Sequence, residues 1–168
     1  MPQETALLVL DRELSVARRV EATPRSTRRD GELTDSFWGR HFVEMEAAYR
    51  FSGGIASDSE VIDMLRQCSD QPMSRLARWI VARAVVSFDC QGTTWLPLFQ
   101  FEGELLSVRP AVTSVIQELA DVFDDWELAT WFALPNTWLQ GTTPVEAVKI
   151  CPFAVREAAR ADRFIARG

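Results

Sequence analysis

Apolar side chains recur every three or four residues along most of the chain, which is the period of an amphipathic helix. The first such stretch covers residues 4–20, and the polar segment 23–31 that follows it is typical of a linker. The chain up to residue 35 holds six arginines and seven acids, so we interpret it as a solvated arm. Further helices are predicted over 37–49, 58–67, 72–84, 110–123 and 125–134, after Thr143, and from Pro152 to about Arg167.

Several of these helices have a start signal in the sequence. In a capping box, a small polar side chain accepts a hydrogen bond from the amide three residues on, and an acid at that position reaches back. Pairs of this kind are Ser57 with Glu60, Asp124 with Glu127, and Thr143 with Glu146. Proline is tolerated in a first helical turn, and such prolines are Pro72, Pro144 and Pro152.

One β-hairpin is predicted between the helices. Residues 84–88 are apolar and rich in valine, and 93–96 can form the returning strand, with Gln91 and Gly92 as the turn. Pro97 is expected to end the second strand or to place it at an edge.

The pair of helices at 58–67 and 72–84, joined by a short turn, is similar to a helix-turn-helix unit, with the hairpin as a wing. The second helix is expected to bury one face, formed by Met73, Leu76, Ala77, Ile80 and Val81. Residues 66–83 have a net charge of +3, from four arginines and one aspartate. A recognition helix would present Arg75, Arg78 and Arg83 to DNA. The alternative is an ordinary helical hairpin with solvated arginines.

The predicted fold class is therefore mainly α, a helical bundle with one β-hairpin. We expect an N-terminal helix and linker over 1–35, a helix-turn-helix-like domain with the hairpin over 36–101, and a small helical domain over 102–168.

Composition limits the partners. The formal net charge of −6 argues against a protein that coats nucleic acid with its whole surface, although a local basic patch is compatible with DNA binding. No segment approaches the ~20 apolar residues of a membrane span. The apolar run 6–10 is too short for a signal peptide, so we expect a cytoplasmic protein.

Catalytic constellations are not recognisable. The sequence has no phosphate-binding glycine loop and no nucleophile elbow. The single His41 has no recognisable nucleophile partner, and the cysteines, which are Cys68, Cys90 and Cys151, lack the short spacing of a zinc site. We therefore expect no enzyme activity, no metal and no cofactor.

A family resemblance rests on the sixth predicted helix with the residues after it, and on one aromatic segment before it. Residues 131–147 read WFALPNTWLQGTTPVEA, and residues 95–101 read WLPLFQF. An apolar helix with tryptophan, a proline-asparagine loop, a leucine near a glycine, and Thr-Pro opening a short helix follow one another in this order. Over about residues 85–165 the chain resembles the toxin-binding domain of Xre/MbcA/ParS-type antitoxins.

The resemblance implies a protein partner, namely a RES-type toxin that consumes NAD, and repression of the protein's own operon through promoter DNA. The implied toxin contacts are Trp126, Asn136, Trp138, Leu139, Arg156, Arg160 and Arg163. We expect Trp138, in the loop, to be the anchor of this contact, and Trp131 to lie in the core. Removal of the chain from Pro152 onward is expected to abolish toxin binding and to leave the N-terminal fold intact.

Two charge runs fit such a partner. Residues 102–127 have a net charge of −6 and can steer a basic protein, and the arginines of the last helix can meet an anionic dinucleotide site. Both runs are equally compatible with solvated helix faces. Self-association is expected, because repressors bind paired half-sites with two-fold symmetry. The alternative function is a stand-alone interaction scaffold or DNA-binding regulator without a toxin.

Overall fold

The computed structural model describes residues 28–168, and side chains from Gly39 onward. The chain divides into two compact units, Met1–Phe37 and Trp38–Gly168, and the description below concerns the second. The helix predicted over residues 4–20 lies outside the described residues.

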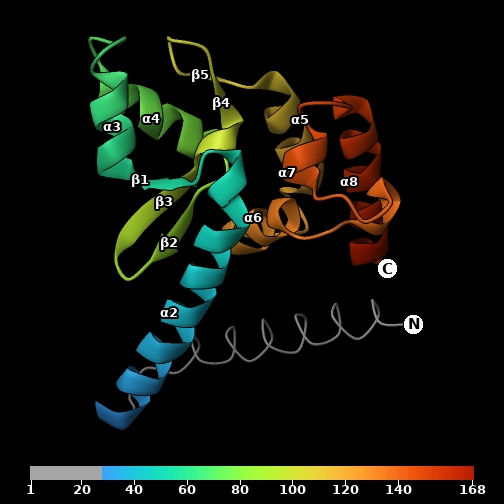
Figure 1. Ribbon diagram of the computed structural model, residues 1–168, viewed down its shortest axis with the longest axis horizontal. Helices are drawn as coiled ribbons and strands as arrows, with labels where there is room; N and C mark the ends of the chain where they lie inside the picture. Colours follow the sequence, from blue (N-terminus) through green and yellow to red (C-terminus); the bar gives the residue numbers. More distant parts are fainter. Residues whose placement is uncertain (1–27) are drawn as a thin grey trace. The chain divides into compact units, whose positions relative to one another are not determined.

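The described part is mainly helical with a small antiparallel sheet, which confirms the predicted class at this level (Figure 1). The elements of its first half are α2 (Arg28–Tyr49), η1 (Arg50–Ser52), β1 (Ile55–Ser57), α3 (Asp58–Leu65), α4 (Pro72–Val81), β2 (Phe88–Cys90), β3 (Thr93–Pro97) and η2 (Leu98–Gln100). They are followed by β4 (Phe101–Glu102), β5 (Ser107–Val108), α5 (Pro110–Leu119), α6 (Asp125–Ala133), η3 (Thr137–Leu139), α7 (Pro144–Ala147) and α8 (Pro152–Arg167).

The helix-start signals are confirmed. In α3 the Glu60 amide donates to Ser57 Oγ at 3.3 Å, and the Ser57 amide donates to Glu60 Oε2 at 2.7 Å. The same reciprocal bonds open α6 and α7, and prolines stand in the first turns of α4, α7 and α8. These bonds satisfy amides that a helix leaves without an intrahelical partner, which is why a local motif predicts the starts well.

The hairpin is also present. Gln91 and Gly92 form its turn with positive φ angles of 52° and 78°. Its first strand begins at Phe88, later than expected, and β3 pairs on its other edge with β1 to give the order β1-β3-β2. A second short hairpin pairs β4 with β5. Neither β1 nor this second pair was predicted.

Gln100 provides hydrogen bonds to the segment before Phe88, which does not join the sheet. Its side chain is fully buried, and its Nε2 donates to the Val86 carbonyl at 2.9 Å. Its Oε1 accepts from the Val86 amide at 2.6 Å. A side-chain amide thus provides both bonds that a neighbouring strand would otherwise provide. Residues 85–87 are buried, and both backbone groups of Val86 are bonded there.

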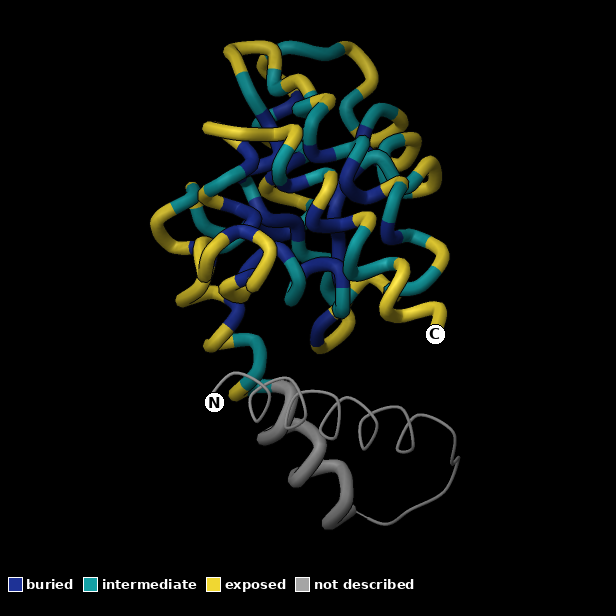
Figure 2. Tube along the Cα trace, turned by 90° about the vertical axis from the view of Figure 1, so that its right-hand side faces the viewer, coloured by how far each residue is buried: buried dark blue, intermediate teal, exposed yellow. Residues whose placement is uncertain are grey.

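One hydrophobic cluster extends across the boundary that the sequence predicted between residues 101 and 102. The structure therefore does not divide the chain at that point. Met45, Tyr49, Phe88 and Phe99 from the first half pack in the same cluster as the buried side chains of α5, α6 and α8. In Figure 1 the sheet, α3 and α4 lie on the left, and α5, α7 and α8 on the right. Figure 2 shows the buried residues inside this unit and exposed residues on its outer turns. The larger of the two hydrophobic clusters of this unit therefore combines residues from both halves and includes α8, and the smaller one lies around α3 and α4.

Two helices differ from expectation. The helix α2 begins at Arg28, inside the segment predicted to be a linker. In α4 the predicted apolar face is turned partly outward, because Met73 is 66% exposed and Val81 is 85% exposed. The side that packs inward presents Leu76, with Trp79 partly buried beside it. Trp79 adds its ring to the inner face, and this large side chain was not included in the predicted stripe.

Gln100→Leu is expected to lower the free energy of unfolding by about 2 kcal/mol or more, because the Val86 amide and carbonyl lose their partners inside the core. Urea unfolding followed by circular dichroism measures the change. The control is Gln117→Leu, since Gln117 is exposed on α5. Equal unfolding midpoints for the two variants would contradict this role of Gln100.

Tyr49 gives the fold a defined response to high pH. It is the single tyrosine of the sequence, and burial raises its pKa well above the ordinary value. Its hydroxyl donates to the buried Ala129 carbonyl at 2.6 Å. A pKa raised in the folded state means that this contribution to stability is fully present below the unfolded pKa and is lost as the pH rises above it.

We expect tyrosinate absorbance to appear together with loss of the helical circular dichroism signal during an alkaline titration. Tyrosinate that forms while the helical signal is intact would show that Tyr49 ionises in the folded protein, contrary to this prediction.

Candidate interaction site

The last helix, α8, packs along α5 and forms one wall of the core. Its inner face presents Val155, Ala158 and Ala159, all buried. Because two of these side chains are single methyl groups, the two helix backbones can approach closely. This packing determines which residues of α8 point toward α5 and which point toward the loop before α7.

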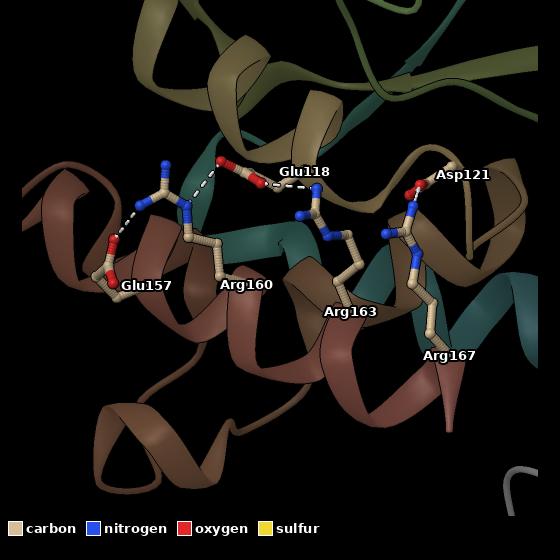
Figure 3. A network of polar contacts seen from close by, with 6 residues as sticks. All are labelled: Glu118, Asp121, Glu157, Arg160, Arg163 and Arg167. Atoms are coloured by element: carbon tan, nitrogen blue, oxygen red, sulfur yellow. Dashed lines mark hydrogen bonds and ion pairs between the residues drawn. The ribbon is translucent and has the colours of Figure 1, made fainter.

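On the α5 side, ion pairs run along the two helices (Figure 3). Glu118 accepts from Arg160 Nε at 2.9 Å and from Arg163 Nη1 at 3.0 Å, and Arg160 also pairs with Glu157. Arg167 pairs with Asp121 at the end of the row. The hydrogen bond to Glu118 is the main cause that raises the pKa of Arg160. Arg160 and Arg163, two of the three arginines expected to face a toxin, are therefore paired within the chain. The third, Arg156, has a buried Nε without a hydrogen-bond partner among the described residues.

The acidic run 102–127 is largely engaged as well. Besides Glu118 and Asp121, Glu102 pairs with Arg109 at 2.6 Å and Asp125 with Arg83 at 2.9 Å. Asp124 and Glu127 bond each other's backbone amides at the start of α6. Three of the seven acids, Glu118, Asp121 and Asp125, thus pair with arginines that are distant in the sequence, and Glu102, Asp124 and Glu127 bond groups within the run itself.

The loop from Pro135 to Thr143 is ordered by its own hydrogen bonds. Asn136 is buried, and its Oδ1 accepts from the Trp138 amide at 2.9 Å. The Asn136 amide donates to Thr142 and its carbonyl accepts from Gly141, at 3.1 and 3.0 Å. Gln140 and Gly141 both have positive φ angles, 58° and 85°, which turn the chain back toward α7.

Asp162 of α8 connects this loop to the core. Its Oδ2 accepts from Trp131 Nε1 and from Asn136 Nδ2, each at 2.7 Å. Its Oδ1 accepts from Trp138 Nε1 at 2.9 Å. Sequence reasoning missed Asp162. The available signal was an acid on the inner face of a predicted helix, following Val155, Ala158 and Ala159 at helical spacing.

Beside this loop an open groove of about 290 Å³ is lined mainly by apolar side chains, including those of Leu139, Ala147, Ile150 and Ala154. Trp138 stands on its wall and is 57% exposed, and Ile150 is 85% exposed. Phe153, in the first turn of α8, is also exposed. We call Trp138, Leu139, Ile150, Phe153 and the groove between η3, α7 and α8 the Trp138 surface.

The other tryptophans expected near the site belong to the packed interior. Trp126 is partly buried, with its ring edge-on to Phe88 at 5.0 Å between centroids. Trp131 packs edge-on against Phe132 and donates to Asp162. The structure therefore brings Asn136, Trp138 and Leu139 together, and it places Trp126 against the sheet.

The arginines expected to reach DNA are mostly engaged within the chain. Arg75 lies over the Trp79 ring, 4.8 Å from its centroid, and donates to the Leu105 carbonyl at 3.0 Å. Arg83 donates to the carbonyls of Ala120 and Phe123 and to Asp125. Arg78 is exposed, and its side chain makes no hydrogen bond or ion pair with the residues whose side chains the structure describes.

Among the described residues, no group of three or more His, Cys, Asp and Glu is arranged to hold a metal ion. Within the same range, none of the helices has both the length and the apolar content needed to cross a bilayer. Comparison of the chain with family models, with curated proteins and with solved structures gave no match.

Glu118→Gln is expected to lower the thermal midpoint by a few degrees at low salt, because Glu118 is largely buried and holds both Arg160 and Arg163. The difference from the unmodified protein should shrink as salt screens the remaining charges. Thermal unfolding at low and high ionic strength measures both effects. The control is Glu104→Gln, an exposed acid of the β4–β5 turn, and an equal shift for both variants would contradict the prediction.

Proposed function

We propose that this chain is a non-catalytic binding protein of the antitoxin type, which binds a cognate protein toxin through the Trp138 surface. The observation that carries the proposal is an exposed tryptophan that is held in place by hydrogen bonds to Asn136 and Asp162. Trp138 is 57% exposed, and yet its amide and its indole N–H are both bonded within the chain. Contiguous exposed apolar surface marks an interaction site, and Trp138 lines the same groove as the exposed Ile150.

The energetics of association favour such a surface. Tryptophan is enriched among the residues that contribute most to protein–protein binding. A loop that is already ordered loses little conformational entropy on docking, so more of the contact energy contributes to affinity. Ile150 and Leu139 line the groove together with Trp138, and Phe153 adds an exposed aromatic ring at the start of α8.

The identity of the partner rests on the resemblance of residues 131–147 to Xre/MbcA/ParS-type antitoxins, which supports a RES-type, NAD-consuming toxin. The contact set differs from that expected from the sequence. Because Arg160 and Arg163 are paired with Glu118, we assign the contact to the apolar groove and to Trp138. The arginines then stabilise α8, the helix that forms one side of the groove.

Repression of the operon through Arg75 and Arg83 receives little support from this geometry, because both guanidinium groups bond carbonyls of their own chain. The proposal is therefore limited to protein binding, and promoter binding and self-association are separate questions.

A scaffold without a toxin is the competing function, and the protein encoded by the neighbouring gene distinguishes the scaffold from the antitoxin. A neighbouring RES-type protein supports the antitoxin, and its absence favours the scaffold.

The sharpest test uses point variants, because deletion from Pro152 onward would remove Val155, Ala158 and Ala159 from the shared core. Such a deletion is therefore expected to destabilise the rest of the fold, contrary to the prediction from the sequence. Trp138→Ala is expected to cost about 2 kcal/mol or more of affinity for the RES-type protein encoded beside the gene, measured by isothermal titration calorimetry. The same variant should fail to rescue cells that express that protein.

The matched control is Phe164→Ala, which removes another exposed aromatic ring of the same region, from a part of α8 that does not line the groove. It should bind like the unmodified chain. Equal affinity for Trp138→Ala and the unmodified protein would place the contact elsewhere, and no binding by the unmodified protein would overturn the antitoxin role.

A further inference from the structure

The carboxylate of Asp162 is the meeting point of three N–H donors from separate parts of the chain: Trp131 of α6, Asn136 of the loop, and Trp138 of η3. We propose that Asp162 is the positioning residue of the Trp138 surface, and that it turns the Trp138 indole N–H inward so that a partner meets an apolar ring. This inference rests on the proposed binding function and adds the chemistry of the partner's contact.

Two of the donors determine the orientation of the carboxylate. Trp131 is held in α6 by its packing on Phe132, and Asn136 is buried and caps η3 through its other amide atom. Both donate to Oδ2 of Asp162. The remaining oxygen, Oδ1, is therefore held in one direction, which is toward Trp138. Hydrogen bonds to an ionised acceptor are stronger than neutral ones, so this third bond restricts the indole ring despite its exposure.

The chemistry of the partner follows from the occupied N–H. A tryptophan at an interface commonly offers its ring for packing and its N–H for a hydrogen bond. Here the N–H is already bonded, so the partner needs no acceptor at this point. The groove next to the ring is lined chiefly by Leu139, Ala147, Ile150 and Ala154. The complementary segment of the partner is thus an aliphatic or aromatic side chain, without a carboxylate or carbonyl directed at the indole.

Asp162→Asn separates this role from general support of α8. The amide oxygen of asparagine can replace Oδ2 and keep the bonds from Trp131 and Asn136. Its NH2 group would then face the indole N–H of Trp138, which places two donors against each other. The control is Glu118→Gln, which removes a carboxylate that also supports α8 but bonds Arg160 and Arg163 instead.

The first measurement needs no partner. In a 15N-labelled protein the indole N–H signals of Trp131 and Trp138 are assigned with Trp→Phe variants, and their exchange with solvent is measured by NMR. Asp162→Asn is expected to speed exchange of the Trp138 N–H by about tenfold or more, as expected for loss of a charge-assisted hydrogen bond, while Glu118→Gln leaves it unchanged. An unchanged Trp138 exchange rate in Asp162→Asn would overturn the proposal.

The second measurement is a double-mutant cycle with the RES-type protein encoded beside the gene as the probe. Asp162→Asn is expected to weaken binding by about tenfold in the unmodified chain and hardly at all in the Trp138→Phe background, because its effect passes through the indole N–H. Equal weakening in both backgrounds would show that Asp162 acts only through Trp131 and Asn136, and would overturn the proposal. If the unmodified chain does not bind this probe, the antitoxin function fails, and the exchange measurement still decides whether Asp162 positions Trp138.

Discussion

The close packing of α8 on α5 is the contact on which the remaining features of the candidate site depend. Ala158 and Ala159 keep the two helices near each other, and the rotation of α8 about its axis is thereby determined. Once this rotation is set, one flank of α8 directs Arg160 and Arg163 toward Glu118 of α5, and Arg167 toward Asp121 of the turn that follows α5. Its inner side directs Asp162 toward α6 and the Pro135–Thr143 loop. A single helix–helix contact therefore positions both the ion pairs and the anchor of Trp138.

The distribution of charge changes the kind of recognition that the site can support. The arginines of α8 and the acids of α5 and α6 mainly bond one another or cap helices, so their fields are local and largely compensated. The surface beside them is apolar and is formed by Trp138, Ile150 and Phe153. Exposed ion pairs contribute little to stability individually, whereas an exposed ring on a rigid loop is well suited to binding. Recognition through shape and apolar contact thus fits this molecule better than attraction of an anion.

The shared core has a consequence for the relation between site and fold. Tyr49 from α2 donates to the Ala129 carbonyl in α6, and Gln100 provides the backbone partners of Val86. The first of these buried bonds joins the N-terminal half of the unit to a helix that carries the site, and the bonds of Gln100 join two segments within the N-terminal half. Residues 102–168 are therefore one side of a common core, and the site inherits its rigidity from residues far away in the sequence.

The local sequence was sufficient to predict structural features that depend on residues a few positions apart. The capping pair Ser57 and Glu60, its counterparts at the starts of α6 and α7, the Gln91-Gly92 turn and the end of α6 before Pro135 are interactions within one turn of chain. The loop position of Trp138 likewise indicated exposure.

Features that need a partner from elsewhere in the chain were decided by the tertiary structure. Sequence spacing placed the arginines of the last helix on one side but could not show that Glu118 and Asp121 lie opposite them. The same limit applies to the pairing of β1 with β3, the inward side of α4, and the role of Asp162. An amphipathic pattern indicates which side chains can be buried. The direction in which each one points depends on the residues that contact it in the packed fold.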